Sequence, residues 1–172
     1  MIVKKLKDCV GLMPMMSDSE IKTINDIITQ NKYKNCLEWG SGNSTIYFPK
    51  TNTCIKNWMS IEHCQNHYSL IKSMVPANVE LIFEKEEKKY INKTKNKKFD
   101  FILVDGINRD ECMDLAFDLL EKNGSIILHD SARKESSGIL TKHKSKIVLL
   151  TEGEKKLKEG YFAHRGIAVF KA

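Results

Sequence analysis

The sequence predicts an α/β fold in which a doubly wound, mostly parallel sheet is covered by helices on both faces. Three observations favour this fold. Short apolar runs alternate with helical patterns from Asn35 to the end of the chain, a loop with two glycines follows the first run, and acidic residues follow several others. Alternation of strands with helices indicates parallel pairing, because each crossover then supplies a helix that covers the sheet.

The segment before the first expected strand contains one amphipathic helix. Ser17 is a candidate N-cap, and Glu20 stands three residues later, as in a capping box. Isoleucines follow at helical spacing, at positions 21, 24, 27 and 28. We therefore divide the chain into an N-terminal segment with a lead-in helix, residues 1–34, and one main domain, residues 35–172.

The apolar runs that follow have the length and composition of strands. They are expected at residues 35–39, 58–63, 79–83, 99–104, 124–128, 146–150 and 166–170. Helices are expected directly after the glycine loop, through Tyr47, and at residues 66–74 and 109–122. No clear helix separates the last two runs, so they could pair as a hairpin that leaves the last strand antiparallel.

Composition narrows the class of protein. The chain has 172 residues, and no apolar run reaches the ~18 residues that a membrane span needs. Residues 1–8 lack the apolar core of a secretory signal, so we expect a soluble, cytoplasmic protein. The five cysteines form no CxxC pair and no zinc-finger spacing, which favours reduced thiols over a metal–thiolate site.

The loop after the first strand carries the most specific pattern, an acidic residue followed by Gly-x-Gly-x-Ser. Gly40 and Gly42 lack a Cβ and let the backbone approach a ligand closely. Glu38 would repel a pyrophosphate and attract an ammonium group. A ligand with an amino-acid end and an adenosine end has these properties, and S-adenosylmethionine is such a ligand.

This pattern resembles the first motif of class I S-adenosylmethionine-dependent methyltransferases, and the resemblance covers about Asn35 to Ala172. It implies a Rossmann-like sheet of seven strands with an antiparallel last strand. Such folds bind ligands at the carboxyl ends of the strands, so we expect a cleft between the ends of the first and fourth strands. Glu62 ends the second strand, where an acid accepts hydrogen bonds from the ribose hydroxyls.

The expected cofactor-binding set follows from these strand ends. In the family, an acid near Glu84 often touches the adenine amine, although Glu80, Glu86 and Glu87 crowd the same region. The full set is Glu38, Gly40, Ser41, Gly42, Ser44, Glu62, His63, Glu84 and Asp105.

The segments around Asp105 and His129 refine the resemblance. The run Leu-Val-Asp-Gly, and later His-Asp followed by Arg, are similar to sugar O-methyltransferases of the glucuronoxylan 4-O-methyltransferase kind. The resemblance implies O-methylation of a sugar, glycan or other hydroxylated small acceptor. We expect Asp105, His129 and Asp130 to be catalytic, because an aspartate or histidine can take the hydroxyl proton. Arg133 could bind an acidic group of the acceptor.

A divalent metal is the alternative to a side-chain base. Asp105 and Asp130 match the two aspartates that hold Mg²⁺ in enzymes similar to catechol O-methyltransferase. Ser131 stands where those enzymes carry an asparagine ligand, so the metal and His129 both stay open as the means of activation.

Other classes fit the sequence less well. A dinucleotide-binding oxidoreductase would need a third glycine, and Thr45 stands at that position. The net charge of +6 invites a nucleic-acid partner, but the lysines are mixed with acids. No Asn/Asp-Pro-Pro motif for base methylation occurs, whereas ribose methylation and a non-catalytic interaction module stay open. The chain has little inserted sequence for a lid, so either the acceptor site is open or a partner chain, as in a homo-oligomer, completes it.

Overall fold

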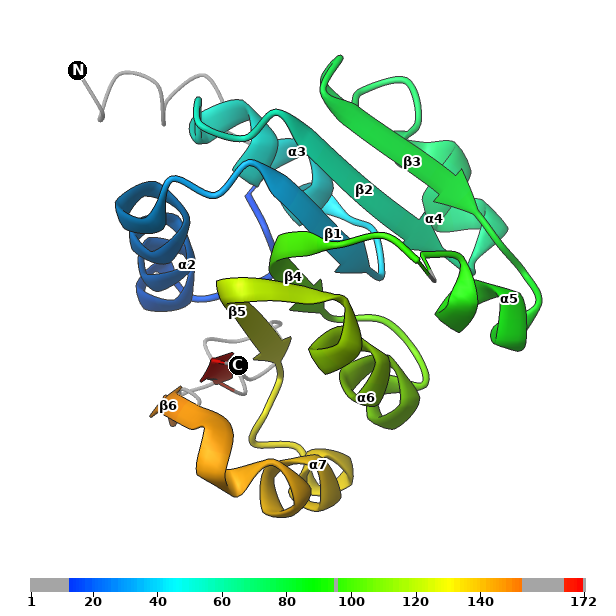
Figure 1. Ribbon diagram of the computed structural model, residues 1–172. Helices are drawn as coiled ribbons and strands as arrows, with labels where there is room; N and C mark the ends of the chain where they lie inside the picture. The colour runs from blue at the N-terminus through cyan, green and yellow to red at the C-terminus, as the bar shows by residue number, and fades with distance from the viewer. Residues whose placement is uncertain (1–12, 95, 153–165, 172) are drawn as a thin grey trace, which may run out of the picture.

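The computed structural model describes residues 13–94, 96–152 and 166–171. Its sheet has seven strands in the order β3-β2-β1-β4-β5-β7-β6 (Figure 1). The strands are β1 Asn35–Trp39, β2 Asn57–Glu62, β3 Val79–Phe83, β4 Phe99–Val104, β5 Leu120–His129, β6 Ile147–Leu150 and β7 Ile167–Lys171. β1 to β5 pair in parallel, and β7 is antiparallel to both β5 and β6. The predicted fold class is confirmed.

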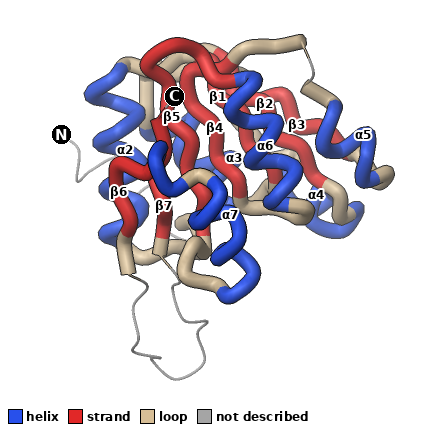
Figure 2. The backbone as a smooth tube through the Cα atoms, turned by 60° about the horizontal axis from the view of Figure 1, so that its bottom comes forward, coloured by secondary structure: helices blue, strands red, loops and turns tan. Residues whose placement is uncertain are grey.

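Helices cover the sheet on both faces (Figure 2). One hydrophobic core lies between the sheet and α5, α6 and α7, and a second lies between the sheet and α2 and α3. The helices are α2 Asp18–Asn31, α3 Asn43–Thr51, α4 Gln65–Ile71, α5 Glu87–Asn92, α6 Arg109–Leu119 and α7 Ser137–Lys142, with short 3₁₀ turns at Lys134–Ser136 and Lys144–Lys146. Among the described residues, no helix is long and apolar enough to cross a membrane.

The central strands are apolar on both sides because both of their faces are covered. In β4, Ile102 and Val104 pack into the core under α6, while Phe101 and Leu103 pack into the core under α2 and α3. β1 and β4 are neighbours, and the strand order reverses between them. Their carboxyl ends are therefore the switch point at which ligands bind in doubly wound sheets.

The structure differs from the sequence expectation at the end of α6. The helix stops at Leu119, three residues earlier than expected, because Leu120 is extended and pairs with Phe99 of β4. β5 consequently begins at residue 120 instead of 124. The short helices α5 and α7 were not expected, and residues 1–12 of the N-terminal segment lie outside the described residues.

Candidate active site

The glycine loop lies between β1 and α3, at the carboxyl edge of the sheet. Gly40 has φ +93°, a conformation that favours glycine, and a Cβ there would lie 2.6 Å from the Cα atom of Gly106. The ends of β1 and β4 therefore touch through two glycines. The cleft that we expected between these strand ends is not the space between the two glycines, and the glycine loop lines neither of the two clefts described below, although Gly106 lines the smaller one.

Gly42 has a different environment from Gly40. Its φ of −178° is extended backbone that any residue adopts. A Cβ at Gly42 would meet nothing nearer than the Oγ of Ser44, at 4.0 Å. Neither the backbone conformation nor the described neighbours require glycine here.

Glu38 lies beneath the loop and is fully buried. Its carboxylate accepts hydrogen bonds from the hydroxyls of Ser44 (2.5 Å), Thr45 (2.6 Å) and Ser60 (2.7 Å), and from Nε1 of Trp58 (3.0 Å). Burial raises the pKa of Glu38 to about 7, although these hydrogen bonds lower it. The expectation that Glu38 meets an ammonium group directly stays a prediction, and in this arrangement the carboxylate is enclosed by its four donors. Glu38 instead fixes the start of α3 to β2.

Glu62 ends β2 and is tied to the same loop. One carboxylate oxygen accepts from the backbone N–H of Ser41 (2.9 Å) and from its hydroxyl (2.8 Å). The other oxygen accepts from the backbone N–H of Cys64 (2.7 Å) and lies 3.2 Å from Nδ1 of His63. Only 1% of Glu62 is exposed. A ribose diol would reach this carboxylate only after the Ser41 hydroxyl turned away.

Glu84 follows β3 and lies farther from the glycine loop along the edge. Its backbone N–H donates to the carbonyl of Glu62 (2.8 Å), and its carboxylate lies 3.5 Å from Nζ of Lys93. It accepts a hydrogen bond from the N–H of Glu86 (3.2 Å). The strand boundary places Glu84, and not Glu80, at the carboxyl end of β3.

The residues expected to be catalytic come together at the ends of β4 and β5. Nδ1 of His129 is 2.8 Å from Oδ1 of Asp105, and the two aspartates and the ring offer ligand atoms that all lie within 4.8 Å of one another. Nε2 of His129 is buried without a hydrogen-bond partner among the described residues. Asp130 has φ +54°, an uncommon conformation for aspartate that holds it beside the ring.

The pKa of His129 reflects opposing effects. Burial alone would lower it, but the hydrogen bond from His129 to Asp105 and the charges of Asp105, Asp130 and Glu20 outweigh burial and raise the pKa above its ordinary value. With Nδ1 donating to Asp105, the neutral ring keeps its lone pair on Nε2. The pair has the arrangement of a histidine base that a carboxylate orients.

Arg109, the first residue of α6, is the functional residue that sequence reasoning missed. Its guanidinium donates to the carbonyls of Gly106 (2.9 Å) and His129 (2.6 Å), and to both the carbonyl (3.0 Å) and the carboxylate (3.1 Å) of Asp105. The same Nη2 lies 4.0 Å from Oδ2 of Asp130. No local pattern marks this residue, because Asp105 lies in the loop before α6 and the carbonyl of His129 is twenty residues away.

Arg133 forms an ion pair with Asp130 and is 40% exposed. It lines a cleft of about 340 Å³ together with Arg109, Asn108 and Ser136, beside α6 and α7. This cleft lies next to the Asp105–His129 pair through Gly106, which also lines it. The cleft is the candidate place for an acceptor.

The cluster does not fit the divalent metal that the sequence resemblance implied. Asp105 and Asp130 do lie together, but the guanidinium of Arg109 stands between their carboxylates and that of Arg133 pairs with Asp130. Cations of the protein thus already pair with one oxygen of each carboxylate, Oδ1 of Asp105 and Oδ2 of Asp130. Ser131, which replaces the asparagine ligand, is fully buried.

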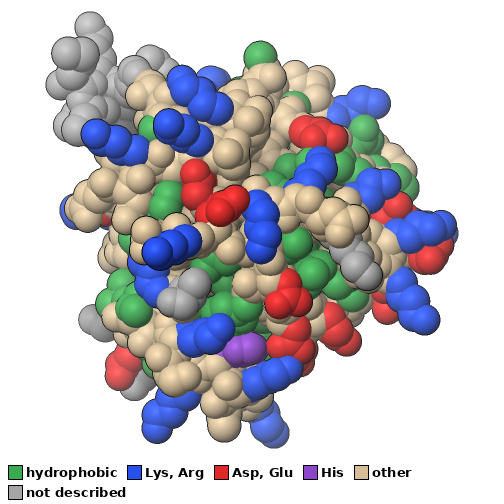
Figure 3. Space-filling model, in the orientation of Figure 1, with side chains coloured by type: hydrophobic (Ala, Val, Ile, Leu, Met, Phe, Trp, Pro, Cys, Tyr) green, Lys and Arg blue, Asp and Glu red, His purple; other side chains and the backbone are tan. Residues whose placement is uncertain are grey.

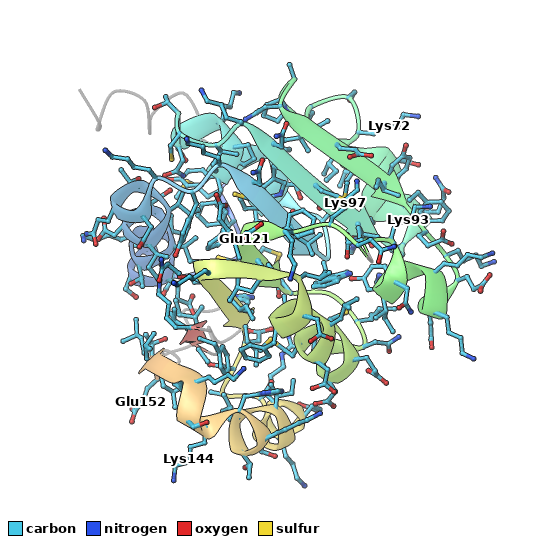
Figure 4. The ribbon with its side chains drawn as sticks, viewed as in Figure 1. Lys72, Lys93, Lys97, Glu121, Lys144 and Glu152 are labelled. Atoms are coloured by element: carbon cyan, nitrogen blue, oxygen red, sulfur yellow. The ribbon has the colours of Figure 1, made fainter. Side chains whose placement is uncertain are left out.

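Basic side chains are scattered over the face of the molecule that Figure 3 draws. On the face drawn in Figure 3, Lys and Arg side chains are interspersed with Asp and Glu. Lys72 and Lys144 lie at opposite ends of the view in Figure 4, and Lys97 lies between them. On this face the distribution is typical of a solvated surface and differs from the continuous basic groove of nucleic-acid-binding proteins.

A larger cleft of about 780 Å³ opens at the amino ends of β1 to β4, where Asn35, Asn57, Lys97 and Phe99 line it. Ligands of doubly wound sheets bind at the other edge. We therefore place the candidate site at the carboxyl edge, although its cleft is the smaller one.

No protein-family model matches the sequence, and a search of curated proteins finds no match. Solved structures do match. The O-methyltransferase from Bacillus cereus in complex with SAH has a TM-score of 0.71 and 17% identity, over 99% of this chain and 90% of that one. The N-methyltransferase NodS from Bradyrhizobium japonicum WM9, in complex with S-adenosyl-L-homocysteine, has a TM-score of 0.58 and 14% identity, over 91% and 87%.

The fold is that of the Rossmann-like methyltransferases. Spermidine synthase from Thermotoga maritima shares it as well, with a TM-score of 0.57 and 12% identity over 86% of this chain and 57% of that one. At such identities the comparison establishes the fold, and function has to be argued from the residues of the site.

Proposed function

We propose that the protein is an S-adenosylmethionine-dependent methyltransferase. The observation that carries the proposal is Gly42, a glycine at the switch point of the sheet that the fold itself does not require. In the shared fold this loop is where a nucleoside ligand approaches the backbone. Two of the similar structures hold the demethylated cofactor, which supports the same ligand here.

The residues that we propose to hold the cofactor surround this loop. Glu62 would accept the ribose hydroxyls in exchange for the hydroxyl of Ser41, which now occupies it. Glu38 contributes by positioning Ser44 and α3 and not by contact. The remaining proposed contacts are Gly40, Gly42, His63, Glu84 and Asp105.

The proposed reaction is O-methylation. S-adenosylmethionine, when bound, supplies the methyl group as a sulfonium electrophile. An acceptor oxygen would take the methyl group with the demethylated cofactor as the leaving group, while Nε2 of His129 would accept the hydroxyl proton. Asp105 holds Nδ1 and stabilises the charged ring that results. The unpaired, buried Nε2 favours this role, because an acceptor hydroxyl would supply the missing partner.

The proposed acceptor is a sugar, a glycan end or another hydroxylated small molecule with an acidic group. The cleft beside Arg133 has a volume of about 340 Å³, which suits one monosaccharide-sized group. The guanidinium of Arg133 can turn from Asp130 to a carboxylate of the acceptor, since it is partly exposed.

The test is an assay with methyl-labelled S-adenosylmethionine and separate acceptors: a neutral sugar, a uronic acid, a catechol and a short RNA. We expect label on the uronic acid above the other acceptors, and a rate at least tenfold lower for His129→Gln. His143→Gln is the matched control, because His143 pairs with Asp114 outside the cluster (3.2 Å). Label on RNA alone would favour ribose methylation, and no transfer to any acceptor by folded protein would contradict the catalytic proposal.

A further inference from the structure

Two carboxylates and an imidazole in one cluster would ordinarily suggest a cation site. Asp105, His129 and Asp130 form such a cluster at the ends of β4 and β5. In this chain a cation already lies among them, because Nη2 of Arg109 is 3.1 Å from Asp105 and 4.0 Å from Asp130.

The position of Arg109 is fixed by the backbone of two strand ends. All three of its guanidinium nitrogens donate, to carbonyls of Asp105 and Gly106 after β4 and to that of His129 at the end of β5. Only 16% of its side chain is exposed. A guanidinium with this many partners is not free to leave when a metal ion arrives.

Local helix energetics do not account for an arginine at this position. Arg109 is the first residue of α6, where the positive end of the helix dipole disfavours a cation. The two residues that follow, Asp110 and Glu111, have the charge that this end prefers. The partners of Arg109 outside the helix therefore determine its placement, and these are the carboxylates and carbonyls of the cluster.

With His129 neutral, the formal charges of the cluster are balanced without a metal. Asp105 and Asp130 carry two negative charges, and Arg109 and Arg133 carry two positive ones. A dication added beside two guanidiniums would be repelled, and it would have to displace hydrogen bonds that the arginines already make.

We infer that the guanidinium of Arg109 takes the place of the divalent metal. It positions the two carboxylates and His129 relative to one another, and the site works without a metal ion. The inference rests on the proposed function, because the cluster is a reaction site only if the protein transfers a methyl group. Its test, however, measures metal binding alone, so its failure can be told apart from a failure of methyl transfer.

The experiment is a titration of the chelator-treated full chain with Mn²⁺, followed by electron paramagnetic resonance of the free ion. We expect wild type to leave Mn²⁺ free up to millimolar concentration. Arg109→Ala should bind Mn²⁺ at least tenfold more tightly (about 1.4 kcal/mol), because it leaves two carboxylates and the imidazole without their central cation. Arg109→Lys retains a cation and should behave like wild type.

Further variants locate the effect. Arg109→Ala combined with Asp130→Asn should lose the Mn²⁺ binding that Arg109→Ala gains. Arg133→Ala should gain less affinity for Mn²⁺ than Arg109→Ala does, because Arg133 pairs with Asp130 and not with Asp105. Circular dichroism melts show which variants fold, and Arg109→Gln replaces the alanine variant if that one does not. Micromolar Mn²⁺ binding by wild type, or a folded neutral variant that gains no binding, would overturn the inference.

Discussion

Burial and hydrogen bonding shift the pKa of the Glu38 carboxyl group in opposite directions. Burial is the larger effect, and the pKa of Glu38 is raised from 4.5 to about 7. Between these pH values the folded state binds more protons than the unfolded state. The free energy of unfolding should therefore fall as the pH rises from the lower value through the higher one, by about 3 kcal/mol for this group.

Glu38→Gln tests this at the level of one residue. Glutamine retains an acceptor for Ser60 and Trp58 but does not ionise, so the fall in stability should be largely removed. Urea unfolding at about pH 5 and about pH 8 measures it. Asp26→Asn, at an exposed pair with Lys22, is the control and should retain the slope. If wild type and Glu38→Gln showed the same change in the free energy of unfolding between the two pH values, the account would be contradicted.

The two glycines of the loop should differ in their effect on stability. Gly40→Ala places a Cβ against Gly106 at a positive φ, so we expect a loss of at least about 1–3 kcal/mol. Gly42→Ala meets open space in extended backbone and should change the free energy of unfolding by less than about 0.5 kcal/mol. Thermal melts distinguish the two. Equal losses would mean that Gly42 also has a role in packing.

His129 should titrate above its ordinary pKa of about 6.5. The raised pKa stabilises the folded state fully below that value, and this contribution is lost as the pH rises through the folded-state pKa. The titration of the ring protons by NMR measures the midpoint directly. Asp105→Asn should lower it, because it removes the carboxylate that holds Nδ1 (2.8 Å). A midpoint below about 6.5 in wild type would show that burial outweighs Asp105.

At the scale of elements, the capping box of α2 was predictable from sequence, and it is confirmed. The hydroxyl of Ser17 accepts from the N–H of Glu20 (3.3 Å), and the carboxylate of Glu20 accepts from the N–H of Ser17 (2.7 Å). We expect Ser17→Ala to lower the free energy of unfolding by about 1 kcal/mol. Denaturant unfolding measures this, with Lys22→Ala on the exposed side of the same helix as the control. Equal stability of wild type and Ser17→Ala would contradict it.

Other elements were not predictable because partners distant in sequence determine them. The apolar pattern of α6 continues through Leu120, yet pairing with Phe99 makes Leu120 the first residue of β5. The hydrogen-bond partners of Glu38 also include residues that are distant in the sequence. Ser60 is its neighbour across the β1–β2 pair, and no local pattern reveals that this hydroxyl points at the carboxylate.

The candidate site could be predicted only in part, because it too depends on partners that are distant in the sequence. Strand ends identify acids at one edge of the sheet, so Asp105 and His129 were correctly expected to lie together. Which acids are free to touch a ligand depends on side-chain partners, and Glu38 proved to be enclosed. Arg109 was missed because one of its anchors is the carbonyl of His129, twenty residues away.

At the scale of the whole molecule, the order of the strands places the glycine loop, Glu62 and the Asp105–His129 pair along one edge. Topology predicts this gathering, since the carboxyl ends of parallel strands share an edge. It does not predict where clefts open. The larger cleft lies at the amino edge, where the described residues between β3 and β4 include one helix, the six residues of α5.

The central claim is that S-adenosylmethionine binds against the backbone at Gly42. Calorimetric titration with S-adenosyl-L-homocysteine tests it most directly, on wild type, Gly42→Ala and the control Gly138→Ala, whose added Cβ meets nothing within 4 Å. We predict micromolar binding to wild type and Gly138→Ala, and at least tenfold weaker binding to Gly42→Ala (about 1.4 kcal/mol). Absence of binding to folded wild type, or equal affinity for all three proteins, would contradict the account.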